Sequence, residues 1–424
     1  MAIMAATKLR REIVAGITTF LTILYLFILY PKMLNSGGVD LGAAFTSTVS
    51  VTILASLFVG FYSKSPIALG PGLGAGAFLV YSLHTNQNVP WPTVLALVFW
   101  VALAMFLISL FKLRQKLIYN LPHALKLGTM GGIGLFLICV GLKELGILVP
   151  DPDTFWRVQD IGTSAHAVAL ITLILLMILY KRQISACYIL AILFASAVGY
   201  GWGLFHVDEI MAIIPPSIKP IAMDVNIADA LQLPMLSSLI ALFLVNIFDT
   251  SASITTLTQL SDQMDEKGHI RNLNKLVLTD GPGGMVAALF GVGTLSFLVE
   301  SSAGIKAGGR TGLTAIIVAV CSIAALFFFP VISAIPMFAI APVLLVVGYS
   351  MAAEIKHLNW KSFTDSVPAL LTFITIPLTF SIYAGFALGF ISFTILKALR
   401  GQASQVHPIC WVITAFFLYN YFIG

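Results

Sequence analysis

The sequence predicts an all-α polytopic membrane protein with about 14 transmembrane segments. Of its 424 residues, 59% are hydrophobic and only 10% are charged, and a soluble domain of this length could not bury so much apolar surface. Apolar runs of about 17–25 residues, each long enough to cross about 30 Å of hydrocarbon, recur from end to end. Strict alternation of apolar and polar residues is absent, which excludes a transmembrane barrel.

The apolar runs define the expected spans in chain order. They cover residues 13–31, 43–62, 66–84, 91–111, 124–142, 163–180, 185–205, 236–257, 276–291, 294–307, 312–329, 333–351, 364–381 and 383–399. A last apolar segment, 407–424, is short and rich in aromatic residues. It either spans the membrane or lies in the interface.

The positive charges sort by side of the membrane when the N-terminus is placed in the cytoplasm. Most of the 23 Lys and Arg residues, Arg114 among them, then fall at cytoplasmic ends of spans, as expected for cytoplasmic loops. The exceptions are Lys32, Lys143, Arg157 and Lys219. We therefore expect a multi-pass protein of the cell membrane, with both ends of the 14-span bundle in the cytoplasm.

Fourteen spans divide into two halves of seven, joined by an outer loop at 206–235. An odd number of spans per half forces the halves into opposite orientations, which is an inverted repeat. Glycines interrupt spans 3 and 10 at matching places, in segments 70–78 and 291–312. Two matched broken spans predict a binding site between them near the middle of the membrane. The alternative is that these glycines serve close helix packing.

Glu300 lies inside the tenth span among small and apolar residues. An ionised carboxylate in hydrocarbon costs several kcal/mol, so such a residue normally faces a cavity or a partner. We therefore expect Glu300, with Ser301 and Ser302 beside it, to form half of a substrate site. The alternative is a Glu–Lys pair that only ties helices together.

The eighth span carries a polar stripe. Asn246, Asp249, Thr250 and Ser253 recur at helical spacing on an otherwise apolar segment, so this face must meet protein or water. Asp280 is expected to open the ninth span, just after its first apolar turn. Together with the acid of span 10, these carboxylates have few nearby bases in the sequence, which indicates a cation or a proton as partner.

Several motifs, spread over nearly the whole chain, are shared with a known family. They are Glu12-Ile-Val-Ala-Gly-Ile-Thr-Thr-Phe-Leu-Thr, Pro66-Ile-Ala-Leu-Gly-Pro-Gly, Leu125-Lys-Leu-Gly, Asn246-Ile-Phe-Asp249-Thr250, Glu300-Ser-Ser-Ala-Gly and Gly308-Gly-Arg-Thr-Gly-Leu-Thr314. On these motifs the sequence resembles the nucleobase/ascorbate transporter superfamily, in its adenine/guanine (AzgA-like) permease branch.

The resemblance implies a core domain made of residues 1–112 and 236–329 and a gate domain made of residues 113–205 and 330–424. The extracytoplasmic segment 206–235 would link the two repeats. It further implies import of a purine base by proton symport, an elevator-type motion of the core, and a homodimer formed through the gate. No cofactor besides the co-transported proton, no metal and no nucleic-acid partner is expected.

The resemblance also assigns roles by motif position. Glu300 would be the base-binding carboxylate, which can accept two N–H bonds from a purine edge. Asp249 and Asp280, with Thr250, would support the site or the proton coupling. Phe78 would stack on the base, although ordinary packing explains an aromatic residue there equally well.

Two positions depart from the pattern of the branch. Gly76 stands where the branch has an asparagine, and Asn246 stands where it has an aspartate. Both positions belong to the predicted substrate site, so the donors and acceptors offered to the ligand change. The sequence therefore leaves the base open among adenine, guanine, hypoxanthine, xanthine and uracil.

Three other functions remain as alternatives. A carrier of another small base or anion on the same fold is one, although the acid Glu300 favours a ligand rich in N–H groups. A membrane enzyme is the second, because Asp262-Gln-Met-Asp265-Glu266 has acidic spacing that could hold Mg²⁺. A passive channel is the third.

Overall fold

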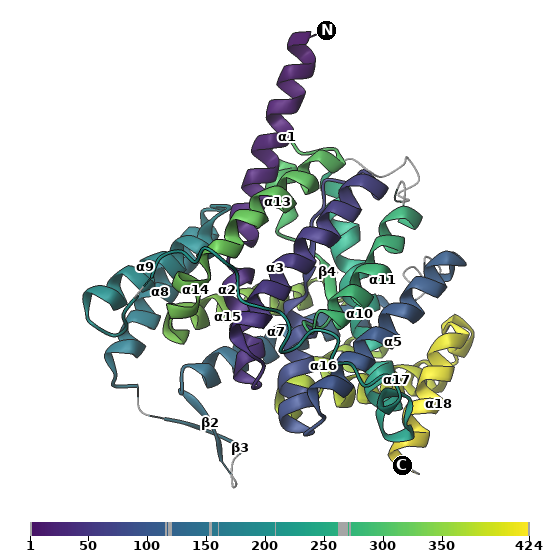
Figure 1. Ribbon diagram of the computed structural model, residues 1–424. Coiled ribbons are helices and arrows are strands. Elements are labelled where there is room, and N and C mark those ends of the chain that lie inside the picture. The colour runs from purple at the N-terminus through teal and green to yellow at the C-terminus, as the bar shows by residue number, and fades with distance from the viewer. Residues whose placement is uncertain are drawn as a thin grey trace.

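The computed structural model describes residues 2–114, 117, 121–151, 155–159, 161–207, 209–261, 270 and 273–422. This part of the chain is a bundle of helices with two short strand pairs (Figure 1). Nine of its helical segments are long and apolar enough to cross a membrane, and three shorter helices are also apolar. The predicted all-α membrane protein is confirmed.

The first repeat breaks its third span, as predicted. Its elements are α1 (Ala2–Ile23), α2 (Leu26–Ser36), α3 (Leu41–Phe58), the π-helical turn η1 (Val59–Ser63), β1 (Leu69–Pro71), α4 (Leu73–Ala77), the π-helical η2 (Phe78–Asn86), α5 (Trp91–Leu110), α7 (His123–Glu144), β2 (Leu148–Asp151), β3 (Phe155–Val158), α8 (Ser164–Lys181) and α9 (Cys187–Gly201). Strands β2 and β3 form a hairpin that projects from the bundle (Figure 1).

The second repeat breaks its tenth span at the matching place. Its elements are η3 (Asp229–Leu231), η4 (Leu233–Met235), α10 (Leu236–Leu260), α11 (Leu273–Leu289), β4 (Leu295–Phe297), α12 (Ser301–Lys306), α13 (Gly312–Ala325), η5 (Leu326–Phe328), α14 (Phe329–Ala334), α15 (Met337–Ala352), η6 (Ala353–His357), α16 (Phe363–Thr379), α17 (Ile382–Leu399), η7 (Ala403–Gln405) and α18 (Pro408–Phe422). Because α11 begins at Leu273, Asp280 lies in the middle of this helix. The expectation that Asp280 opens the span is wrong.

The two broken spans meet through their strands. Strands β1 and β4 pair antiparallel, with Gly70 opposite Ser296. The helix contacts of the two repeats also correspond. In each case the second span of one repeat packs on the fourth span of the other: α3 contacts α13, and its counterpart α11 contacts α5, the counterpart of α13. Likewise α1 contacts α12, and its counterpart α10 contacts α4. The fold is therefore a seven-plus-seven inverted repeat in which each half contributes one strand at the centre.

The helices form two packing groups. The core group consists of α1–α5 and α10–α13, and the gate group consists of α7–α9 and α15–α17. Contacts between the groups run from α4 and α10 to α7, from α10 to α17, and from α1 to α9. The C-terminal helix α18, whose spanning the sequence left open, packs on α17. The domain boundaries expected from the sequence stay predictions.

Gly304 determines how closely α12 approaches α1. A Cβ atom at this position would lie 2.0 Å from Thr19 Oγ1 and 2.4 Å from the carbonyl oxygen of Ala15. Only a residue without a side chain allows this contact. The glycine therefore holds α12, and with it the neighbouring Glu300, against the first helix.

We expect Gly304→Ala to destabilise the folded protein by about 1–3 kcal/mol, because the added methyl group must push α12 away from α1. Thermal unfolding of the purified protein in detergent measures the effect. Gly201→Ala is the matched control, since a Cβ at Gly201 meets nothing within 4 Å. Unfolding curves that coincide for Gly304→Ala and the unsubstituted protein would contradict this packing.

Candidate functional site

A cavity of about 780 Å³ lies between the two packing groups. On the core side it is lined by residues of β4, α10 and α12, and on the gate side by residues of α7, α8, α9 and α15. The two acids predicted for the site, Asp249 and Glu300, both line it, as do Ser253 and Ser302. The fold therefore brings one carboxylate from the continuous helix α10 and one from the broken tenth span to a single cavity.

Glu300 lies at the start of α12, just after the extended segment that contains β4. Its Oε1 accepts a hydrogen bond of 2.5 Å from the hydroxyl of Tyr25, which lies between α1 and α2. The ring of Tyr25 packs in turn on that of Tyr188 from α9, with centroids 4.7 Å apart. The partner of the carboxylate is thus a tyrosine hydroxyl, not the lysine of the alternative interpretation.

Asp249 is held by the central strands. Its Oδ2 accepts a hydrogen bond of 2.5 Å from Ser296 Oγ of β4. Gly72 makes room for this pair, because a Cβ there would lie 3.0 Å from Ser296 Cβ. Asp249 is therefore positioned by both broken spans. Strand β4 supplies the hydrogen bond, and Gly72, which follows β1, leaves the space for it.

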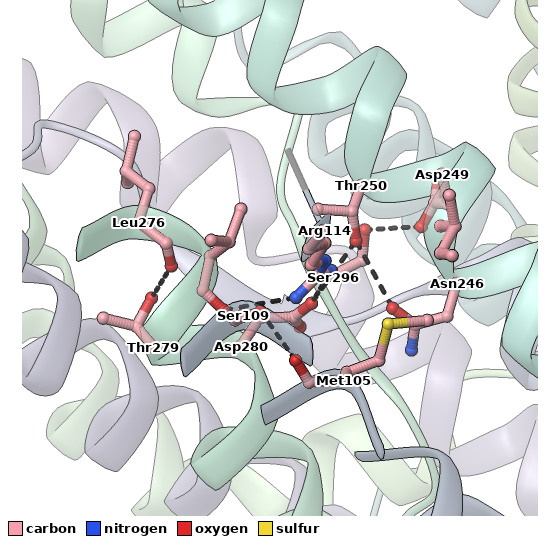
Figure 2. Close-up of polar contacts among 12 residues, drawn as sticks. Met105, Ser109, Arg114, Asn246, Asp249, Thr250, Leu276, Thr279, Asp280 and Ser296 are labelled. Atoms are coloured by element: carbon pink, nitrogen blue, oxygen red, sulfur yellow. Dashed lines mark hydrogen bonds and ion pairs between the residues drawn. The ribbon is translucent and has the colours of Figure 1, made fainter. Parts of the chain in front are cut away.

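The polar stripe of α10 divides between two environments. Asp249 and Ser253 face the cavity, whereas Asn246 contacts Thr250, which in turn reaches Asp280 of α11 (Figure 2). Thr250 Oγ1 lies 3.4 Å from Asn246 Oδ1 and 3.4 Å from Asp280 Oδ2. The predicted residues Asn246, Thr250 and Asp280 therefore form a second network, behind the cavity wall.

Arg114, just after α5, completes this second network (Figure 2). Its guanidinium forms an ion pair with Asp280 and donates a hydrogen bond of 3.2 Å to the carbonyl oxygen of Val277. The side chains of Arg114 and Asp280 are only 0% and 3% exposed. The expectation that the acids have few nearby bases is therefore wrong for Asp280, whereas the placement of Arg114 at a cytoplasmic end of its span stays a prediction. No local signal distinguishes a buried arginine from a loop cation at the end of an apolar run.

The structure places the remaining predicted residues outside the cavity lining. Phe78 is fully buried, and the aromatic residues that line the cavity from the gate group are Tyr180 and Tyr188. A Cβ at Gly76 would lie 2.4 Å from Tyr30 Cε2, so this glycine lets α4 pack on α2. Ser301 Oγ accepts a hydrogen bond of 3.0 Å from the backbone N–H of Ala68 and thereby ties the two broken spans together. Contact of these residues with a substrate stays a prediction.

Glu12 connects two of the shared motifs, its own in α1 and the one that ends at Thr314. It is only 7% exposed, and its Oε1 accepts hydrogen bonds from the backbone N–H groups of Arg310 (3.0 Å) and Thr311 (3.1 Å). Its Oε2 accepts the hydroxyl hydrogen bond of Thr314. This carboxylate therefore fastens α1 to the start of α13, where it supports the fold beside α12.

The described residues contain no candidate metal site. No group of three or more His, Cys, Asp or Glu side chains there could hold an ion. The acidic segment 262–266, on which the enzyme alternative depends, lies outside the described residues.

Comparison with known sequences identifies the family. The permease family matches residues 10–388. The chain belongs to the permease family. A putative permease of Methanocaldococcus jannaschii is 34% identical over 97% of this chain and 94% of its own length. The adenine permease AdeQ of Escherichia coli is 32% identical, covering 97% and 92%, and the guanine/hypoxanthine permease PbuO of Bacillus subtilis is 31% identical, covering 98% of each chain.

These relatives confirm the resemblance to the purine branch of the nucleobase/ascorbate transporter superfamily, and the permease is a transport protein rather than an enzyme. Solved structures with the same fold include the transmembrane domain of the cyanobacterial bicarbonate transporter BicA. It has a TM-score of 0.69 at 18% identity and covers 89% of this permease and 97% of that chain. Murine Slc26a9 in the inward-facing state gives a TM-score of 0.66 at 12% identity, covering 92% and 68%.

Proposed function

We propose that this permease carries a purine nucleobase, with Glu300 as the acceptor for N–H groups of the base. The observation that carries the proposal is the position of Glu300, which lines the cavity between the two packing groups and already receives one hydroxyl hydrogen bond. Charge-assisted hydrogen bonds in a site shielded from water discriminate strongly between ligands. The relatives named as adenine and guanine/hypoxanthine permeases support the same substrate class.

Proton symport is the coupling that we propose. Asp280 is already paired with Arg114, so of the three acids predicted inside the spans, Asp249 and Glu300 are the ones that line the cavity and can exchange a proton there. Import would follow from an elevator-type motion of the core group against the gate group, in a homodimer formed through the gate. Lys181 and Lys306 also line the cavity, and the loop charges would place its opening on the cytoplasmic side.

A ligand panel on the detergent-purified protein tests the substrate class. A purine at 100 times its Kd should raise the stability by about 2.7 kcal/mol, whereas uracil and bicarbonate should leave the melting temperature unchanged. Stabilisation by bicarbonate alone, or by no purine, would contradict the proposal.

Reconstituted vesicles test the coupling separately. Uptake of the purine that binds should accelerate when the vesicle lumen is made alkaline and should fall when a protonophore is added. An uptake rate that changes under neither condition would rule out proton symport, and the proposal of a purine substrate would be unaffected.

A further inference from the structure

Tyr25 occupies an unusual place behind the cavity. It lies between the end of α1 and the start of α2, and its side chain is fully buried. Its hydroxyl donates a 2.5 Å hydrogen bond to Glu300 Oε1, although 275 positions separate the two residues in the chain. Glu300, in contrast, is partly accessible and lines the cavity. The tyrosine therefore approaches the carboxylate from the protein side and leaves it open to the cavity.

This hydrogen bond constrains the carboxylate. The hydroxyl of a tyrosine has a single hydrogen to donate, and Tyr25 donates it to one oxygen of the Glu300 carboxylate. The bond therefore fixes the position of that oxygen relative to α1 and α2. It also restricts the rotamers of a long side chain that would otherwise lose substantial conformational entropy when a ligand binds.

The ring of Tyr25 is itself held in place. It packs on Tyr188 with an interplanar angle of 43°, and Tyr188 lines the cavity from α9. The chain of contacts runs from the gate group through Tyr188 and Tyr25 to the carboxylate of Glu300. Each link fixes the orientation of the next, so the acceptor is preorganised before a ligand arrives.

We propose that Tyr25 is a positioning residue for substrate binding, which acts by holding Glu300 as an oriented acceptor. The proposal rests on the proposed function, because it assumes that Glu300 binds the base. It assigns Tyr25 no direct contact with the substrate. Its contribution is the alignment of the carboxylate with the N–H groups of a purine edge.

Tyr25→Phe is the decisive variant, because it removes the hydroxyl and keeps the ring that packs on Tyr188. We expect the KM for purine uptake to rise about ten-fold or more, while the maximal rate per folded molecule changes little. KM does not depend on how many molecules fold, so a partial loss of folded protein leaves the readout valid.

Tyr30→Phe is the matched control. Tyr30 is a buried tyrosine of α2, and its hydroxyl donates to the backbone carbonyl oxygen of Val292 at 2.6 Å. Its loss should reduce the amount of folded protein without changing KM. An unchanged KM in Tyr25→Phe, or an equal rise in Tyr30→Phe, would overturn the positioning role.

A double variant separates this inference from the proposed function. If Tyr25 acts through Glu300, adding Tyr25→Phe to Glu300→Gln should cause no further rise in KM. An additive rise would overturn the inference alone. If the unsubstituted permease binds no purine, the proposed function fails first, whatever Tyr25 does.

Discussion

Arg114→Met is expected to lower the free energy of unfolding by about 3–5 kcal/mol, the cost of leaving one charge of a buried ion pair without its partner. Both side chains are almost completely buried, so water cannot replace the lost guanidinium. The remaining carboxylate of Asp280 must then either stay charged among apolar helices or take up a proton. Thermal and denaturant unfolding of the purified protein in detergent measures the loss.

Two further variants test whether the loss in Arg114→Met comes from the broken ion pair. Arg10→Met, at an exposed position of α1, makes the same chemical change and should leave stability within about 0.5 kcal/mol. Arg114→Met combined with Asp280→Leu removes both charges and should recover most of the lost stability, because an apolar pair of similar size often replaces a buried ion pair without cost. A double variant no more stable than Arg114→Met would contradict the ion pair as the cause.

Glu300→Gln is expected to weaken purine binding at least about 100-fold, which corresponds to about 2.7 kcal/mol. The substitution keeps the shape of the side chain but turns a charged acceptor with two oxygens into an amide with only one. Without ligand, the variant should unfold at the same temperature or higher, since a carboxylate is costly in this environment. Equilibrium binding to the purified protein measures the change.

The control for Glu300→Gln is the same substitution at Glu209, an exposed position in the linker between the repeats. Purine affinity should be unchanged in Glu209→Gln. If Glu300→Gln also binds the purine with unchanged affinity, Glu300 does not bind the base, and the substrate must be held by other residues of the cavity.

Much of the architecture was predictable because it depends on local properties of the chain. Apolar run length predicts the spans, and glycines in spans 3 and 10 predict where the helices break. The cavity acids Asp249 and Glu300 were also predictable, because a carboxylate inside a span rarely faces lipid. These predictions need only hydropathy and spacing.

The partners of these acids were not predictable, because they depend on the tertiary arrangement. Tyr25 is one aromatic residue among many in apolar spans, and nothing in its neighbours indicates that its hydroxyl reaches Glu300. Arg114 follows an apolar run, as most loop cations do. Phe78 received its stacking role from its motif position and is fully buried, so its contact with a substrate stays a prediction.

The antiparallel pairing of β1 with β4 has a consequence for the ancestry of the protein. Each repeat supplies only one of the two strands, so either repeat alone would leave extended backbone without hydrogen-bond partners in the hydrocarbon, which is strongly disfavoured. A primitive half-length chain would have needed a second copy, inserted upside down, to complete the ladder. Duplication and fusion of such a gene would have joined the two copies, in opposite orientations, in one polypeptide, so that the two strands always pair.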